Sequence, residues 1–344
     1  MAERIRESKR ALAERVTDTF LANHPDWVAR YGPRTRRFGI EDACFHFDFL
    51  AAAVEAGSIA AFADYACWAT RILIHRGLPA EALEENLGQV GRAAAQLDES
   101  FSSWIESCTR AAATACRQST MGRLPTASNE SQLKSLQRLF AEAIRGGNRT
   151  AATNLVLQAI RDGHRLADIY VDVVQESLYE IGRLWEENKI TVADEHMATA
   201  VAQFVIAQIY PLIEPLPQSR GRMVITGVEG EQHQIGANIV ADFLELHGWS
   251  VRFLGVNTPH SGVMRAVDEH QATVVGISAT MLFSLPRVVD LTLDLRQAFP
   301  NRIRILLGGA AVRIAPSIAQ DIGADAWAHD LRSALETADR LIRI

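Results

Sequence analysis

From Arg222 onward the sequence alternates between short apolar runs and amphipathic segments, and no other feature narrows the choice of fold as far. The apolar runs lie at 223–228, 251–256, 273–278, 304–309 and 325–330. Segments with apolar residues at helical spacing lie at 236–247, 261–270, 284–299, 312–321 and 331–343. Apolar strands separated by helices are typical of a parallel sheet that is covered on both faces. The sequence therefore predicts a doubly wound, five-stranded α/β domain over 218–344, with strand order 2-1-3-4-5 and ligands at the carboxyl ends of the strands.

The chain before residue 218 lacks this alternation and has apolar residues at helical spacing instead. We expect a helical bundle over 1–118, with helix–helix turns at Gly57-Ser58 and Gly77-Leu78-Pro79. A polar stretch over 119–130 predicts a linker. A second helical unit over 131–217 is expected to hold four helices, at 131–145, 150–162, 165–187 and 192–213. Taken together, these patterns predict a multidomain α + α/β protein.

The loop after the first predicted strand, Gly230 to Gly236, carries the residues best placed for ligand chemistry. A neutral His233 imidazole at this edge of the sheet could bind a transition metal through one ring nitrogen. Its other nitrogen then needs an acceptor, and Glu231 is the local candidate. Gly236 opens the following helix without a side chain that would obstruct a large flat ligand. Taken alone, a loop histidine is more often solvated or structural than a metal ligand, so the surrounding pattern has to decide.

That pattern resembles the cobalamin-binding, flavodoxin-like fold of methionine synthase, the B12-dependent mutases and the corrinoid methyltransferase proteins. The resemblance rests on the acid-x-His-x-x-Gly loop, on Leu246-His247-Gly248-Trp249 and on the segment 253–259. It implies that His233 is the lower ligand of cobalt, in place of the cofactor's own dimethylbenzimidazole. The further cofactor positions that it implies are Glu231, Gln232, Gln234, Ile235, Gly236, Ser278, Thr280, Gly308 and Gly309.

Two positions in this region depart from the family pattern. Glu231 stands where an aspartate is usual, so we expect its hydrogen bond to His233 to be longer or differently angled. Thr280 replaces a commoner leucine, which should affect the packing of the nucleotide tail more than cobalt ligation.

The second helical unit should cap the upper face of the corrin. Its spacing of Trp185, Val192, Glu195 and His196 resembles the adenosylcobalamin-dependent photoreceptors that repress carotenoid genes. The resemblance implies that these side chains enclose the 5′-deoxyadenosyl group and that light breaks the cobalt–carbon bond. Glu186 stands where those repressors have a histidine that ligates cobalt after illumination, so we expect a less locked light state. A core tryptophan beside a surface Glu-His pair is the simpler interpretation without the cobalamin domain.

The N-terminal bundle is rich in aromatic residues and resembles a degenerate globin-like fold. A globin-like bundle joined to this cap and cobalamin domain resembles the photocobilins, which carry biliverdin beside B12. Biliverdin is therefore an expected second cofactor, bound non-covalently. The expected contacts are Arg34, Arg36, Arg37, His46, Tyr65, Trp68, Arg71 and His75. An aromatic stripe is also what an ordinary helical core contains.

Composition and charge limit the remaining possibilities. A net charge of −6 and the absence of a winged-helix pattern or basic recognition helix in 1–118 argue against nucleic-acid binding. The charged N-terminus and the interrupted apolar runs predict neither a signal peptide nor a membrane span, hence a cytoplasmic protein. We expect a light sensor, not an enzyme, that forms homo-oligomers in a light-dependent way and signals to an unknown protein effector. The alternatives are a corrinoid methyl carrier for a partner methyltransferase and a light-blind B12-sensing regulator.

Overall fold

The computed structural model describes residues 1–119, 133–213, 220–314 and 322–343. The chain divides into two compact units. Unit 1 holds the N-terminal helices together with Met281–Val289, and unit 2 holds the second helical segment and most of the α/β region. The linker expected over 119–130 lies outside the described residues, apart from Ser119.

Unit 1 is helical throughout its N-terminal part, as predicted. Its helices are α1 (Ala2–Asn23), α2 (Asp26–Tyr31), α3 (Thr35–Glu55), α4 (Ile59–His75), α5 (Ala80–Ala95), η1 (Glu99–Phe101) and α6 (Ser102–Ser119). The helix α1 packs against α3, and α6 packs against both α4 and α5. The predicted turns are present: Gly57 and Gly77 have φ values of +63° and +79°, a backbone conformation that glycine adopts without strain.

The helical part of unit 2, which we call the cap, follows the predicted helices with one exception. It consists of α7 (Lys134–Arg145), α8 (Arg149–Arg161), α9 (Leu166–Asp168), η2 (Ile169–Gln175), α10 (Glu176–Glu186), α11 (Val192–Ile209) and η3 (Tyr210–Leu212). The prediction of one regular helix over 165–187 is wrong, because η2 is wound as a π-helix. At the start of α11, Thr191 and Asp194 form a capping box that fixes where the helix begins.

The sheet of unit 2 confirms the predicted topology. Its strands are β1 (Arg222–Gly227), β2 (Ser250–Phe253), β3 (Val274–Ser278), β4 (Arg304–Gly308) and β5 (Ala326–Trp327). All pairs are parallel, and the order is β2-β1-β3-β4-β5. The chain therefore reverses direction across the sheet between β1 and β3, where the loops after these strands diverge and leave a crevice for a ligand.

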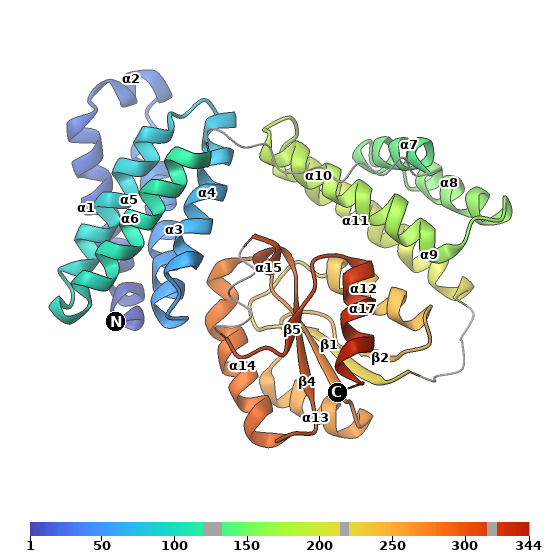
Figure 1. Cartoon of the computed structure of the whole chain (residues 1–344). Coiled ribbons are helices and arrows are strands. Elements are labelled where there is room, and N and C mark those ends of the chain that lie inside the picture. Colours follow the sequence, from blue (N-terminus) through green and yellow to red (C-terminus); the bar gives the residue numbers. More distant parts are fainter. Residues whose placement is uncertain (120–132, 214–219, 315–321, 344) are drawn as a thin grey trace. The chain divides into compact units, whose positions relative to one another are not determined.

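The helices that follow the strands are α12 (Ile235–Glu245), α13 (His260–His270), η4 (Leu282–Ser284), α14 (Leu285–Ala298), α15 (Ala310–Ile314) and α17 (Leu331–Leu341). Helices α12 and α17 pack against each other and lie on one side of the strands, with α14 on the other side (Figure 1). The predicted helix 312–321 coincides with α15 only up to Ile314, and its remainder lies outside the described residues.

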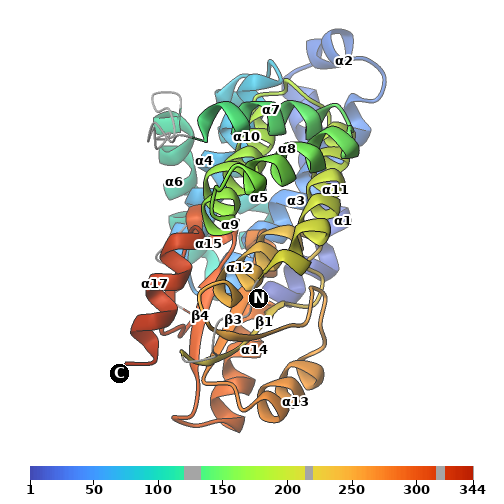
Figure 2. The ribbon, with the colours of Figure 1, turned by 90° about the vertical axis from the view of Figure 1, so that its right-hand side faces the viewer.

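The cap shares one apolar core with the helices that cover one side of the sheet. Ile239 and Phe243 of α12 and Leu331 of α17 are buried in the same cluster as Tyr170 and Val205 of the cap. Figure 2 shows the cap helices gathered beyond one end of the strands. Since the cap contacts the chain immediately after β5, through Tyr179 and the backbone of His329, that end is the carboxyl end.

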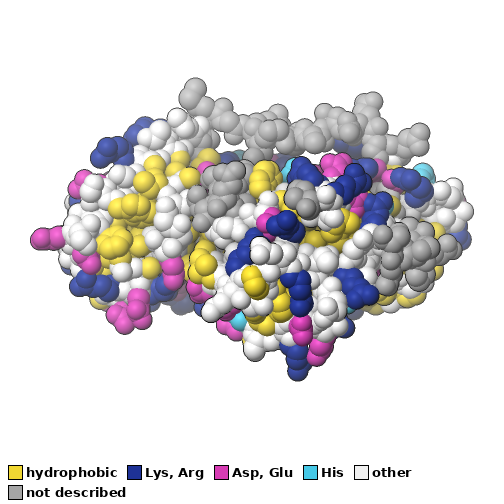
Figure 3. Space-filling view, turned by 60° about the horizontal axis from the view of Figure 1, so that its bottom comes forward, with side chains coloured by type: hydrophobic (Ala, Val, Ile, Leu, Met, Phe, Trp, Pro, Cys, Tyr) yellow, Lys and Arg dark blue, Asp and Glu magenta, His cyan; other side chains and the backbone are white. Residues whose placement is uncertain are grey.

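The surface carries mixed charge. On the face that Figure 3 shows, basic and acidic side chains lie beside one another with small apolar areas between them. Within the described ranges, no helix has both the length and the apolar character needed to cross a bilayer.

Candidate functional site

The loop between β1 and α12 lies at the switch point and is held in place by the neighbouring loop after β2. The Gly230 amide donates a hydrogen bond to Oδ1 of Asn257 (2.8 Å), and the Gly227 amide donates to the carbonyl of Gly255 (2.9 Å). A side chain at Gly227 would collide with Val256, since an added Cβ would lie 2.6 Å from its Cγ1. The two loops are therefore closely packed, and the position of His233 is set by both.

The Glu231 carboxylate is the centre of the site. It is almost fully buried and accepts four N–H groups. Its Oε1 accepts from the amides of Gln232 and His233 (2.9 Å each) and lies 2.6 Å from His233 Nδ1. Its Oε2 accepts from the amide of Thr280 at the end of β3 (2.7 Å). The carboxylate thus ties the loop after β1 to the loop after β3.

The hydrogen bond between Glu231 and His233 is not longer, because 2.6 Å is at the short end for a charge-assisted hydrogen bond; a different angle stays a prediction. The reason for the short bond lies in Gly227. A Cβ at this glycine would lie 3.2 Å from Cγ of Glu231. Because residue 227 has no side chain, the extra methylene of Glu231 has room there.

The electrostatics of the pair favour one tautomer. Burial raises the pKa of Glu231, but the hydrogen bonds from His233 and Thr280 outweigh it and hold that pKa below its usual value. The hydrogen bond to Glu231 raises the pKa of His233 against the opposing effect of burial, and the charges of Glu231 and Glu195 add to the rise. A proton on Nδ1 is therefore directed at Glu231, which leaves the Nε2 lone pair as the one that could ligate a metal.

Glu195 is the residue of the cap whose charge is felt at this site. It lies on the first turn of α11, and its charge contributes to the raised pKa of His233. Its carboxylate is held by its own helix: Oε2 lies 2.6 Å from His196 Nδ1, and Thr199 Oγ1 donates to Oε1 (3.0 Å). A carboxylate fixed in this way can accept hydrogen bonds from ligand hydroxyls.

The other predicted cap residues lie on the same two helices, α10 and α11. Trp185 and Glu186 end α10 and are half-buried, while Val192 begins α11 and is 55% exposed. The side chain of His196 is 74% exposed. The structure thus places an aromatic plane, an apolar side chain and a carboxylate on the two cap segments joined by the turn 187–191.

The positions predicted for the nucleotide tail lie at the ends of β3 and β4. Ser278 is buried at the end of β3, and Gly308 ends β4. Gly309 has φ +100°, and a Cβ there would approach the Ala279 carbonyl oxygen to 2.2 Å, so only glycine fits. Around Gly236, in contrast, an added Cβ would meet open space. Gln232 and Gln234 are exposed beside it, and Ile235 is half-buried.

This donor set fits a cobalamin. The imidazole of His233 is 53% exposed and has its tautomer fixed, and Gly236 in the first turn of α12 has open space where a side chain would lie. Sequence reasoning missed two contributors, the Thr280 backbone amide and the Asn257 side chain. Asn257 could have been suspected, because asparagine tolerates the left-handed conformation it adopts here (φ +56°) at a switch-point loop.

The residues predicted for biliverdin lie in different surroundings in unit 1. His46 Nδ1 lies 2.5 Å from the Tyr65 hydroxyl, and both side chains are buried. Burial lowers the pKa of His46 to about 4, so its imidazole is neutral. Tyr65 stacks on Phe49 with ring centroids 3.7 Å apart and lies 6.1 Å from the Trp68 ring.

The predicted cationic contacts are not gathered around this pair. Arg36 binds Asp18 and Arg37 binds Glu41, both on the surface. Arg71 donates to Sγ of Cys67 (3.2 Å). Arg34 and His75 are exposed, at the start of α3 and the end of α4.

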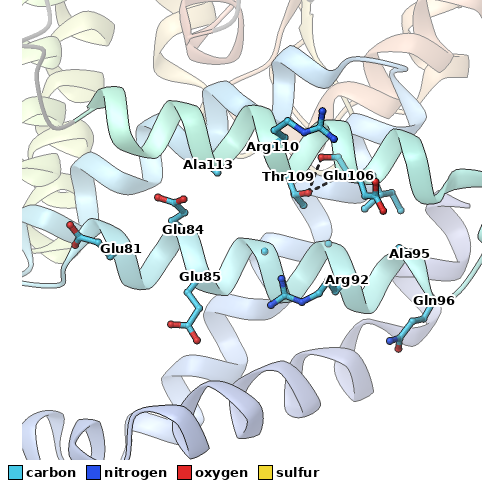
Figure 4. A pocket seen from close by; sticks show the side chains of 13 residues that line it. Glu81, Glu84, Glu85, Arg92, Ala95, Gln96, Glu106, Thr109, Arg110 and Ala113 are labelled. Atoms are coloured by element: carbon cyan, nitrogen blue, oxygen red, sulfur yellow. Dashed lines mark hydrogen bonds between the residues drawn. The ribbon is translucent and has the colours of Figure 1, made fainter.

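Unit 1 also has a groove of about 860 Å³ between α5 and α6 (Figure 4). Glu81, Glu84 and Glu85 lie toward one end of it, and Arg92 and Gln96 lie toward the other. None of the eight residues predicted for biliverdin lines this groove. The bilin site therefore stays a prediction.

Comparison with known proteins agrees with the geometry of unit 2. Residues 221–338 match the B12 binding domain family, and residues 136–210 match a second family of that description. The chain is 25% identical over 206 residues to a corrinoid protein of Desulfitobacterium hafniense, which covers 58% of this chain and 94% of that protein. It is 33% identical over 143 residues to the HTH-type transcriptional repressor CarH of Myxococcus xanthus, which covers 41% of this chain and 47% of the repressor.

Among solved structures, the monomethylamine corrinoid protein of Methanosarcina barkeri is similar in fold, with a TM-score of 0.55 and 22% identity. The similarity covers 61% of this chain and 99% of that one. The first matched range contains the His233 loop, and the second contains the cap helices from α7 to α11. The chain is a cobalamin-binding protein.

Proposed function

We propose that the protein is a light-sensing photoreceptor that holds adenosylcobalamin between the His233 loop and the cap, and that it is not an enzyme. The observation that carries the proposal is Glu195 on the first turn of α11, whose carboxylate is held by His196 and Thr199 (2.6 and 3.0 Å) and whose charge contributes to the raised pKa of His233. When bound, adenosylcobalamin supplies a cobalt–carbon bond that light breaks.

Each residue of the site has a role in this proposal. His233 ligates cobalt from below through Nε2, and Glu231 holds its Nδ1 proton. Trp185 stacks on the adenine, and Glu195 accepts hydrogen bonds from the ribose hydroxyls, with Val192 and His196 beside them. Ser278 and Thr280 border the nucleotide tail at the end of β3, while Gly308 and Gly309 border it at the end of β4.

The proposed output is a movement of the cap. Once the adenosyl group has gone, Trp185 and Glu195 lose their contacts, and the cap has to repack because an unfilled cavity is costly. We expect this repacking to change how copies of the chain associate. Size-exclusion elution of the cobalamin-loaded protein in the dark and after illumination tests the association; identical elution in both would contradict it.

The pocket itself is tested by comparing two forms of the cofactor. Trp185→Ala and Glu195→Ala should weaken adenosylcobalamin binding more than methylcobalamin binding, since only the former presents an adenine and ribose hydroxyls. Gln208→Ala, an exposed change at the far end of α11, is the matched control and should affect neither form. Equal losses for both forms would remove the adenosyl pocket from the proposal.

A second candidate is a corrinoid methyl carrier that serves a partner methyltransferase. It is favoured by the match to the Desulfitobacterium corrinoid protein, which runs over 94% of that protein's length. A carrier would work in its methyl–cobalt form with a partner and would not need Trp185 or Glu195 for binding. The light-blind B12-sensing regulator differs from both, because its adenosylcobalamin form would be unchanged in size by illumination.

Biliverdin in unit 1 is a separate part of the proposal and is supported by the resemblance to the photocobilins and by the ring-rich surroundings of His46 and Tyr65. Titration of the full chain with biliverdin should produce far-red absorption, and His46→Ala should reduce it. A chain that gains no such absorption at saturating biliverdin would leave unit 1 as a protein-binding module.

A further inference from the structure

The π-helix η2 is the part of the cap that contacts α17, and it is almost entirely buried. An α-helix turns about 100° per residue, so residues five apart would lie about 140° apart around its axis. A π-helix is bonded from residue i to i+5, which places such residues nearly above one another. The winding of η2 therefore puts Tyr170 and Gln175 on one face.

Both of these side chains bind the cobalamin-binding domain. The Tyr170 hydroxyl donates to Oδ2 of Asp242 on α12 (2.8 Å), and the Leu331 amide at the start of α17 donates to Oε1 of Gln175 (2.9 Å). Tyr170 is 0%, Asp242 5% and Gln175 6% exposed. One turn of π-helix thus holds the two helices that cover this side of the sheet.

Asp242 belongs to the helix that carries the His233 loop. Helix α12 begins at Ile235, two residues after His233, and Asp242 lies two turns further along. Its neighbours Ile239 and Phe243 pack into the core of the cap. The Tyr170–Asp242 bond therefore fixes the cap relative to the same helix that begins at the cobalt ligand.

The chemistry of this contact is unusual for a packed core. A buried carboxylate loses its hydration, so an apolar pair of similar size would be as stable or more stable. Apolar surfaces can slide over one another, whereas a hydrogen bond fixes direction and distance. Stability alone would not require a polar pair inside this otherwise apolar interface. Fixing the position of the cap relative to α12 would require one.

We propose that Tyr170 and Asp242 are a positioning pair that holds Trp185 and Glu195 of the cap in register over His233. This inference rests on the proposed function, because it assigns the pair to selection of the adenosyl form. The pair does not touch the cofactor, so its loss should leave ligation by His233 intact and impair only the discrimination between upper groups.

The test replaces the pair by apolar residues, Tyr170→Phe with Asp242→Leu, in the full chain. We expect an unfolding midpoint at or above that of the wild type, together with an unchanged His233-ligated spectrum. The preference for adenosylcobalamin over methylcobalamin should fall about fivefold, which corresponds to about 1 kcal/mol. Hydrogen exchange of the α10 amides should become faster in the cobalamin-free protein.

Two further variants separate the bond from other effects. Asp242→Asn keeps an acceptor for Tyr170 and should keep the preference even if the apolar pair fails to fold. Tyr210→Phe removes the hydroxyl of an exposed tyrosine that binds Glu245 of α12 (3.0 Å). It should change neither the preference for adenosylcobalamin nor the exchange of the α10 amides. An apolar pair that keeps the full preference would overturn the inference. If the wild type itself shows no preference, the proposed function fails, and α10 exchange then decides alone: unchanged exchange rejects the pair, and faster exchange supports it.

Discussion

Replacing Glu231 by glutamine tests the centre of the site with the smallest change of shape. The glutamine carbonyl can keep the three bonds of Oε1, but its NH₂ group then faces the Thr280 amide, which is also a donor. One bond to a charged acceptor is lost, worth about 1.5–3 kcal/mol, and a buried donor is left without an acceptor. Since an unsatisfied buried donor costs about 1–3 kcal/mol, we expect the free energy of unfolding of unit 2 to fall by about 2.5–6 kcal/mol, as the sum of the two effects.

The same change should also weaken cobalamin binding. Loss of the group that orients a ligating histidine typically costs about 10–100-fold in affinity. Urea unfolding of the cobalamin-free protein and titration with cobalamin measure the two effects separately. Glu229→Gln is the matched control, since it makes the same chemical change at an exposed position of the same loop. The reasoning is refuted if Glu231→Gln behaves like Glu229→Gln in both assays.

Three shorter predictions follow from the same unit. Burial raises the pKa of Asp242 to about 6, so its contribution to stability is present below its unfolded pKa of 3.8 and is lost as the pH rises through about 6. The stability lost over the whole titration is about 3 kcal/mol. The urea midpoints measured at pH 5 and pH 8 should therefore differ less in Asp242→Asn than in the wild type. An equal difference in the two proteins would contradict this. His233→Ala should abolish the His-ligated spectrum and weaken cobalamin binding, and an unchanged spectrum would exclude His233 as the ligand. Gly309→Ala should destabilise unit 2 by about 2 kcal/mol or more because of its backbone strain and the close Ala279 carbonyl, whereas Gly236→Ala should leave stability unchanged and weaken cobalamin binding.

The sheet could be predicted from sequence because its central strands β1, β3 and β4 are largely buried on both faces and therefore read as continuous apolar runs. The exception is β5, which was expected over 325–330 and pairs only at Ala326 and Trp327. Asp325 explains the late start of pairing: its carboxylate accepts the Ile305 amide (2.6 Å) and binds Arg296, so its side chain takes a place in the ladder. A run with aspartate at each end is weaker evidence for a strand than its apolar centre suggests.

The π-winding of η2 could not be predicted in the same way. The residues of 165–187 have ordinary helical composition, and one inserted residue in the winding leaves no mark on the apolar pattern. Only the positions of Tyr170 and Gln175, five apart in a buried run, hint at it. The winding is decided by what the two side chains bind, and those partners lie about 70 and 160 residues further along the chain.

The contacts of the site are likewise of two kinds, those between residues close in sequence and those that only the fold brings together. His233 and Glu231 are two residues apart, so their pairing is local and visible in the sequence. The Thr280 amide and Asn257 reach the site through the fold, and a backbone amide carries no residue-type signal at all. The same limit explains why the short Glu231–His233 bond was not expected, since the fit of the glutamate depends on the missing side chain of Gly227.

The two faces of the proposed cofactor site are joined through one helix. The N-terminus of α12 continues from the His233 loop, and its side carries Asp242 and Phe243 into the cap. A shift of the cap therefore acts on the helix that positions the lower ligand, and ligation of His233 acts on the cap through the same helix. Coupling between two sites is reciprocal in binding free energy. Occupancy of the adenosyl pocket should consequently raise the affinity of His233 for cobalt by a certain factor, and His233 ligation should raise the affinity of the pocket for the adenosyl group by the same factor. Breaking the Tyr170–Asp242 bond should reduce that factor.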